Sequence, residues 1–149
     1  MKSIISPLLC LFLLGCSAES YSPDTNFYET SVFGKWRMVS YADNRQIPFD
    51  VTLELKSEKD SLGRNIITGK SPLNFYFSTF TINPSDSAIT VYDIQSTKIE
   101  GAVSQVSFEK NYYEMLTKVK KYEISESGKT LNLILPSTEN QHIVYNLTQ

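Results

Sequence analysis

The sequence has 149 residues, which suits one compact domain and is short for two. Hydrophobic residues make up 41% and charged residues 20%, close to ordinary globular usage, so the composition excludes a chain that is disordered throughout. With 14 Lys and Arg against 16 Asp and Glu, the net charge is -2, and this slightly acidic balance argues against a nucleic-acid-binding protein. No apolar stretch reaches the roughly 18 residues of a membrane-spanning helix.

The first sixteen residues have the pattern of a bacterial lipoprotein signal. One positive charge, Lys2, precedes a mostly apolar run, Ile4–Leu14, about as long as the core of a signal peptide. The run ends in Leu13-Leu14-Gly15-Cys16, which resembles the lipobox of bacterial lipoproteins. The sequence therefore predicts a signal peptide at residues 1–15 and attachment of acyl chains, such as palmitate, at Cys16. The alternative is an ordinary secretory signal with a chance cysteine.

A protein acylated at Cys16 is anchored on a membrane without spanning it. Ser17 follows, and not the Asp that retains lipoproteins at the inner membrane of enteric bacteria, so we expect the outer membrane. The other cysteine, Cys10, lies in the part that is removed. The mature chain then has no free thiol, which excludes a disulfide framework, a thiolate metal site and a cysteine nucleophile.

The polar residues that follow, through residue 30, show no apolar period, and we expect a lipidated Cys and flexible tether at residues 16–30 and a folded domain at residues 31–149. In the domain, alternation, aromatic and β-branched content and turn signals predict a series of short strands. They span residues 35–41, 51–56, 65–69, 75–82, 88–92, 121–125, 130–135 and 142–147.

One helix interrupts the strands, between Gln105 and Lys120. Its apolar residues recur at helical spacing, whereas Glu109 is expected on the outside; Ser104 or Ser107 is the expected cap. The apolar set is Phe108, Tyr112, Met115, Leu116 and Val119. We predict an α+β fold, a strongly curved antiparallel sheet or incomplete β-barrel of seven to eight strands, with this amphipathic helix on its open side.

Catalytic and metal signals are sparse. The one histidine, His142, falls in a predicted strand, and no nucleophile elbow, Gly-rich phosphate loop or metal-ligand spacing is present. We therefore expect no catalytic residue, metal or cofactor, and no enzyme. The strand aromatics are expected to form the core, or else to line an apolar pocket on the concave face. They are Trp36, Tyr41, Phe75, Phe77 and Tyr92.

Four segments, which begin at Gly34, Gly69, Ser96 and Val119, occur in an order that resembles the META domain (HslJ-like) family over about residues 33–147. The opening Gly34–Val39 is similar to the family's Gly-x-Trp start, and Gly69–Tyr76 to its Gly, Cys-Asn, aromatic segment. Ser96–Gly101 is similar to its Thr-Lys segment, and Glu109 and the Val119–Tyr122 region with Leu131-Asn132-Leu133 follow in order. The resemblance implies an α+β fold and roles in envelope stress, motility or secretion, with no established reaction.

The chain departs from that family at two positions. Leu73 and Gly101 stand where many members have cysteines, so no role of the cysteine pair is carried over to this chain. If the two positions are neighbours in the fold, the loss of both cysteines together is expected. A lipocalin-like barrel, which also opens with Gly-x-Trp, is the alternative. In such barrels an Arg late in the chain usually packs over the Trp, but here the last arginine is Arg64.

Two functions remain open at this point. The first is a non-enzymatic, lipid-anchored envelope protein that binds a protein partner or assists envelope assembly. The second is a lipocalin-like carrier of a small apolar ligand, for which Trp36, Tyr76 and Asn74 are the candidate binding residues.

Overall fold

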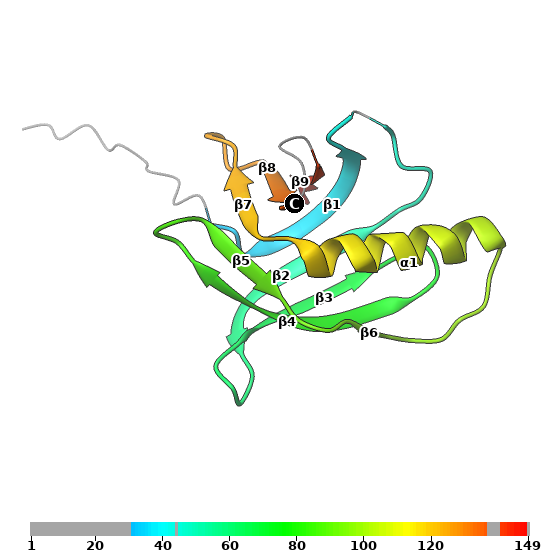
Figure 1. Ribbon diagram of the computed structural model, residues 1–149, viewed down its shortest axis with the longest axis horizontal. Helices are drawn as coiled ribbons and strands as arrows, with labels where there is room; N and C mark the ends of the chain where they lie inside the picture. The colour runs from blue at the N-terminus through cyan, green and yellow to red at the C-terminus, as the bar shows by residue number, and fades with distance from the viewer. Residues whose placement is uncertain (1–30, 44, 137–140, 149) are drawn as a thin grey trace, which may run out of the picture.

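The computed structural model describes residues 31–43, 45–136 and 141–148. The predicted signal peptide, Cys16 and the tether lie outside the described residues. Within the described part the chain forms nine strands and one helix (Figure 1). They are β1 (Gly34–Tyr41), β2 (Thr52–Lys59), β3 (Asn65–Lys70), β4 (Phe75–Asn83), β5 (Ala88–Val91), β6 (Gln95–Ser96), α1 (Val103–Lys118), β7 (Lys121–Ile124), β8 (Thr130–Ile134) and β9 (His142–Leu147).

The strands pair antiparallel in the order β3-β2-β1-β9-β8-β7-β5-β4-β6. Because β4 also pairs with β3, the sheet curves round into a ring. The pairing of β5 with β7 is the narrowest part of this ring, with one register pair, Ala88 and Lys121. This arrangement confirms the expected α+β fold, a strongly curved antiparallel sheet with one helix. Within the described part of the chain, no helix combines the length and the apolar character needed to cross a membrane.

Alternate residues of the long strands point into the ring and form its core. On β4 the inward residues are Tyr76 and Phe80, so Phe75 and Phe77 point outward and are 61% and 44% exposed. The expectation that Phe75, Phe77 and Tyr92 belong to the core is therefore wrong, whereas Trp36 is buried as expected. The reason is the two-residue period, which allows only one set of a strand's aromatic residues to face inward.

The helix packs its buried face into the core through Tyr112 and Leu116, both fully buried. It begins at Val103, earlier than predicted, and its N-cap is Ala102 and not a serine. The Ala102 backbone N–H donates to Oε1 of Gln105 at 3.1 Å, which satisfies a group at the helix start. The expectation that Glu109 lies on the outside is wrong, because its exposed fraction is only 8%.

The short strand β6 is absent from the sequence prediction. It has two residues, both exposed, and pairs with Tyr76 and Phe77 of β4. A strand of two polar residues has no apolar alternation, so only its tertiary pairing identifies it.

Candidate functional site

The centre of the ring is occupied by three tyrosines joined by hydrogen bonds. Tyr145 of β9 donates to the hydroxyl of Tyr112 on α1 at 3.2 Å, and that hydroxyl lies 2.8 Å from the hydroxyl of Tyr76 on β4. Tyr76 in turn donates to the Thr52 carbonyl oxygen at 2.8 Å. Burial raises the pKa of Tyr112 to about 12 and the pKa values of Tyr76 and Tyr145 well above their usual value. At neutral pH these are uncharged hydroxyls that tie the helix to both sides of the sheet.

Glu109 forms the second buried polar cluster, with the turn at residues 71–74. One carboxylate oxygen accepts from the Asn74 side-chain amide at 2.5 Å. The other accepts from the Asn74 backbone N–H at 3.1 Å and from the Ser71 hydroxyl. The Tyr113 hydroxyl lies 2.8 Å from that of Ser71, and burial, with a smaller effect of the nearby Glu109 charge, raises the pKa of Tyr113. The carboxylate thus holds the turn against the helix.

Asn74 extends this cluster to a third segment. Its Oδ1 accepts from the Thr97 hydroxyl and from the Ile99 backbone N–H, both at 2.8 Å. In the described part of the chain every buried side-chain nitrogen or oxygen has a hydrogen-bond partner. Because the polar groups of the cluster are satisfied within the protein, we assign Asn74 and Glu109 a structural role that joins the turn, the 97–99 segment and α1.

Trp36 is also held structurally. Its side chain is 1% exposed, and the indole N–H donates to the Val32 carbonyl oxygen at 3.0 Å. Tyr76 and Asn74 are 3% and 5% exposed. Trp36 and Tyr76 border one outer groove, whereas Asn74 borders a separate depression, so the three candidate binding residues are not gathered at one site. Their role in ligand binding stays a prediction.

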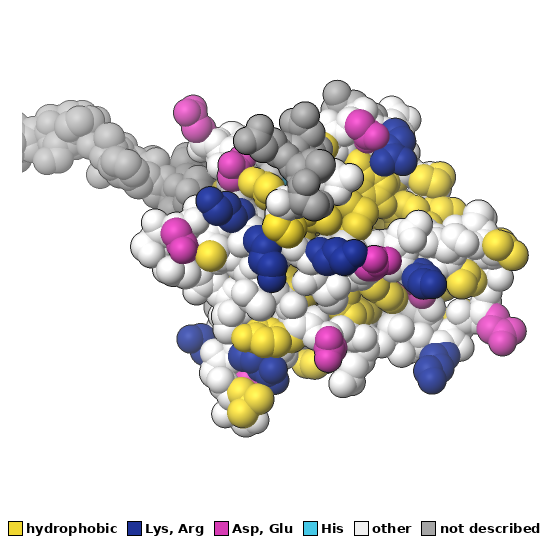
Figure 2. Space-filling model, in the orientation of Figure 1, with side chains coloured by type: hydrophobic (Ala, Val, Ile, Leu, Met, Phe, Trp, Pro, Cys, Tyr) yellow, Lys and Arg dark blue, Asp and Glu magenta, His cyan; other side chains and the backbone are white. Residues whose placement is uncertain are grey.

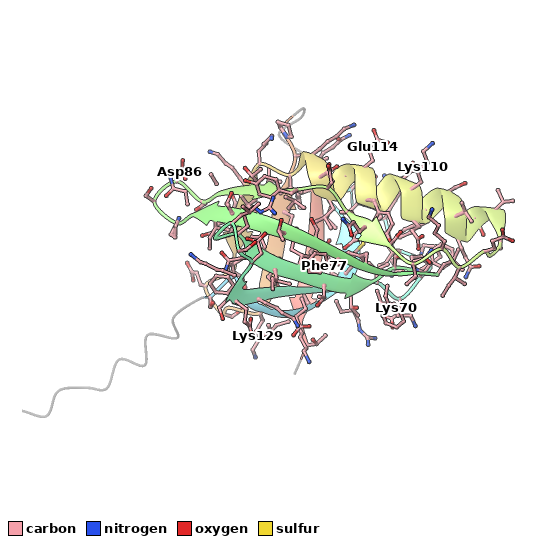
Figure 3. The ribbon with its side chains drawn as sticks, turned by 90° about the horizontal axis from the view of Figure 1, so that it is seen from below. Lys70, Phe77, Asp86, Lys110, Glu114 and Lys129 are labelled. Carbon is pink, nitrogen blue, oxygen red and sulfur yellow. The ribbon has the colours of Figure 1, made fainter. Side chains whose placement is uncertain are left out.

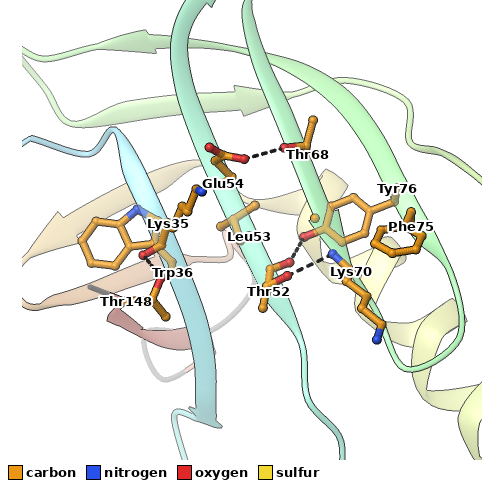
Figure 4. A pocket seen from close by; sticks show the side chains of 11 residues that line it. Lys35, Trp36, Thr52, Leu53, Glu54, Thr68, Lys70, Phe75, Tyr76 and Thr148 are labelled. Atoms are coloured by element: carbon orange, nitrogen blue, oxygen red, sulfur yellow. Dashed lines mark hydrogen bonds between the residues drawn. The ribbon is translucent and has the colours of Figure 1, made fainter.

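The groove that Trp36 and Tyr76 border runs across the outer face of β1 to β4 and has a volume of about 500 Å³ (Figure 4). Its outward side chains are Lys35, Thr52, Glu54, Thr68, Lys70 and Phe75. The Thr68 hydroxyl donates to Glu54 at 3.1 Å, and Lys56 lies 3.7 Å from the same carboxylate oxygen. The carboxylate is thereby held at the sheet surface.

The depression that Asn74 borders has a volume of about 530 Å³ and lies between the 96–101 segment and the start of α1. Leu73 and Val106 line it. Ile99, Val103 and Val106 are 53%, 82% and 48% exposed and lie close together in the chain. Figure 2 shows hydrophobic side chains at this end of the molecule. We call Ile99, Val103 and Val106 the apolar tip.

Leu73 and Gly101 are neighbours in space, as their joint departure from the family pattern predicts. A Cβ built on Gly101 would overlap the end of the Leu73 side chain. Leu73 therefore fills the space that a side chain at position 101 would need.

The helical spacing contained the signal for Glu109. The buried residues Glu109, Tyr112 and Leu116 are spaced i, i+3 and i+7, which places all three on one helix face. The charge of Glu109 favoured an exposed position, whereas its spacing from Tyr112 and Leu116 indicates the buried face of the helix. The exposure of Phe75 and Phe77 has a similar signal in the sequence. Tyr76 stands between them in the strand, so it faces the opposite side of the sheet from both.

The described residues contain no group of three or more His, Cys, Asp or Glu side chains placed to hold a metal ion. His142 lies at the start of β9, opposite Ile134 of β8.

The fold is similar to two solved structures. One is the NMR structure of a protein from Burkholderia xenovorans, with a TM-score of 0.63 and 18% identity, covering 93% of this chain and 99% of that one. The other is the crystal structure of a DUF4847 family protein from Bacteroides vulgatus, with a TM-score of 0.52 and 15% identity, covering 76% of this chain and 91% of that one. No curated protein matches the sequence. The META domain model matches residues 30–148, and the chain therefore belongs to the META domain family.

Proposed function

We propose that the protein is a lipid-anchored protein of the bacterial cell envelope, held at the outer membrane through Cys16, whose domain is a non-catalytic protein-binding module. Two facts support the non-catalytic part. The META domain family is not known for an enzymatic activity. The buried polar clusters of the described residues are satisfied internally, which is typical of structural networks.

The observation that carries the proposal is the apolar tip. Val103 is 82% exposed although it is a β-branched apolar residue in the first turn of a helix. Val106 lies one helical turn further on and lines the same depression as Ile99, and both are about half exposed. Apolar side chains grouped on a surface, next to a depression, are typical of protein interaction sites.

The position of the apolar tip favours a protein over a lipid as its partner. Figure 1 shows the first described residues toward the left of the long axis and the start of α1 at its right end. A chain tethered through Cys16 has its membrane attachment on the side of residue 31. The apolar tip then lies at the end of the domain opposite the attachment, where it is open to other envelope proteins.

Crosslinking in living cells tests this proposal. A photoreactive amino acid at Val103 is expected to form a discrete product with an envelope protein, and Ile99→Lys is expected to abolish that product without unfolding the domain. The matched control is the same photoreactive amino acid at Leu62, which is 72% exposed on the β2–β3 turn. Products that are the same from both positions, or that persist in Ile99→Lys, would contradict the proposal.

The anchor has a separate test. Labelled palmitate is expected in the wild-type protein and not in Cys16→Ser, and Cys16→Ser is expected to accumulate as an uncleaved precursor. Normal processing of Cys16→Ser to the mature length would reject the lipoprotein assignment. The proposal that the apolar tip binds a protein does not depend on this result.

The alternative function, a carrier of a small apolar ligand inside the curved sheet, is disfavoured by the tyrosine chain. Tyr76, Tyr112 and Tyr145 are packed and hydrogen-bonded where such a ligand would lie.

A further inference from the structure

The outer groove over β1 to β4 has features of a ligand site that the apolar tip lacks. Its volume of about 500 Å³ falls within the range of small-molecule sites. A second depression, of about 360 Å³, shares Phe75 and Tyr76 with the groove and is also lined by Phe77. Together they form an elongated surface rather than an isolated hollow.

The backbone hydrogen-bonding groups beneath the groove are already paired within the sheet. β2 pairs with β1 and β3, and β3 pairs with β2 and β4, so the central strands have no free edge. An extended peptide therefore has no sheet edge to join here. A ligand in this groove is recognised by side chains.

The charge of those side chains favours an anion. Among the described residues, neither Lys35 nor Lys70 has a carboxylate within the 4.0 Å of an ion pair, whereas Glu54 is already engaged by Lys56 and Thr68. In the sheet register Lys35 is opposite Glu54 and Lys70 is opposite Thr52. Two strand spacings and a two-residue offset put their Cα atoms about 12 Å apart. Both flexible side chains can approach one anionic group between them.

Aromatic side chains lie beside one of the two lysines. The Lys70 Nζ is 6.0 Å from the centre of the Phe75 ring, and Phe75 and Phe77 are 61% and 44% exposed. Figure 3 shows Lys70 and Phe77 on the face formed by β3 and β4. The register places Lys70 opposite Phe75 and Thr68 opposite Phe77. An apolar group attached to the anion would therefore lie on the two rings.

We infer that this groove binds an anionic amphiphile, a molecule with a phosphate or carboxylate head and an apolar body. The head lies between Lys35 and Lys70, and the body lies along Phe75 and Phe77. Neither the apolar tip nor its protein partner is needed for this binding, so the inference goes beyond the proposed function.

Native mass spectrometry of the full mature chain in a non-ionic detergent tests the inference. The probes are short-chain phosphatidylglycerol, phosphatidylcholine with the same acyl chains, octanoate and inorganic phosphate. We expect phosphatidylglycerol to bind at least roughly tenfold more tightly than phosphatidylcholine, because of these two phospholipids only phosphatidylglycerol has a net negative charge. If octanoate binds more tightly than phosphatidylglycerol, the anionic head of the ligand is a free carboxylate. If phosphatidylglycerol binds more tightly, the anionic head is a phospholipid headgroup.

Variants locate the site. Lys35→Gln with Lys70→Gln is expected to abolish the preference for the anionic probe, and Phe75→Ser with Phe77→Ser is expected to weaken every amphiphile. Lys110→Gln with Lys121→Gln removes the same charge from exposed positions outside the groove and is expected to change neither.

Three results would overturn the inference. They are no binding of any amphiphile, equal binding of the two phospholipids, and binding of inorganic phosphate as tight as that of the amphiphiles. Thermal unfolding of each variant, compared with that of the wild type, separates loss of the site from loss of the fold. If the lysine variants unfold, Lys35→Arg with Lys70→Arg, which keeps the charge, is expected to bind normally.

Discussion

Gly69 illustrates at the scale of one residue why a motif of the META domain family is structural. A Cβ at this position would overlap the Thr52 carbonyl oxygen and the ring of Tyr76, which donates to that oxygen. Only a glycine allows the Tyr76 hydroxyl to reach its acceptor. Asn74, in the same segment, acts through its bonds to Glu109. The segment is thus explained by two hydrogen-bonding clusters.

Gly69→Ala is expected to lower the free energy of unfolding by about 1–3 kcal/mol, because the rigid Tyr76 ring and a backbone carbonyl must move. Urea denaturation measures this loss. The matched variant is Gly101→Ala, whose new methyl group would meet only the flexible end of Leu73 and the side chain of Gln105, so its loss is expected to stay below about 1 kcal/mol. Equal losses would show that Tyr76 adapts freely.

At the scale of elements, α1 is attached to the sheet in two different ways. Tyr112 and Leu116 supply apolar burial, and Glu109 supplies hydrogen bonds to a turn about 35 residues earlier in the chain. The two contributions are separable by substitution, because Glu109 and Leu116 lie about two turns apart on the same face.

Glu109→Gln is expected to lower the free energy of unfolding by about 1.5–3 kcal/mol. The amide replaces an oxygen that accepts hydrogen bonds with a nitrogen that donates, which leaves a buried donor of Asn74 or Ser71 without its charged acceptor. The control is Glu114→Gln on the same helix, where the carboxylate is 56% exposed and pairs with Lys118. That control is expected to leave stability nearly unchanged, because the pair is exposed to solvent. Similar losses in both variants would reject the bridging role of Glu109.

Leu116→Ala is expected to cost about 2–5 kcal/mol, because the side chain is fully buried between the helix and the sheet. Val103→Ala, at an 82% exposed position of the same helix, serves as the control and is expected to stay within about 0.5 kcal/mol. Thermal or urea unfolding compares the two. A loss below 0.5 kcal/mol for Leu116→Ala would mean that the helix is peripheral to the core.

At the scale of the whole molecule, the tyrosine chain links folding to alkaline pH. Burial raises the pKa values of Tyr76, Tyr112 and Tyr145 above the value of 10.0 that holds in the unfolded chain, to about 12 for Tyr112. Above pH 10 the unfolded state therefore binds fewer protons than the native state. The stabilisation is complete below pH 10 and is lost as the pH rises toward 12 and beyond.

The urea concentration at the midpoint of unfolding is accordingly expected to decrease from pH 10 to pH 11.5. This decrease is expected to be larger than any change from pH 8 to pH 9. Tyr145→Phe removes one of the buried hydroxyls and is expected to show a shallower fall, even though its stability at pH 8 is lower by about 1 kcal/mol. An identical pH dependence in both proteins would show that Tyr145 does not contribute to it.

The sequence by itself determined every strand except β6, the helix except for its first residues, and the burial of Trp36 and Leu116. These properties are local: a two- or 3.6-residue period and a turn signal are read from adjacent residues. The same local pattern carried the resemblance to the META domain family. It determined no binding surface, because exposed apolar and charged side chains have no period of their own.

Only the tertiary structure decided how the sheet closes, which aromatic residues of β4 face outward, and what Glu109 binds. Each depends on groups far apart in the chain. The partner of Glu109 is Asn74, and the groove joins Lys35 of β1 to Lys70 of β3. Strand pairing and helix packing bring such residues together, and the physical reason is that burial selects the closed arrangement as a whole rather than any single contact.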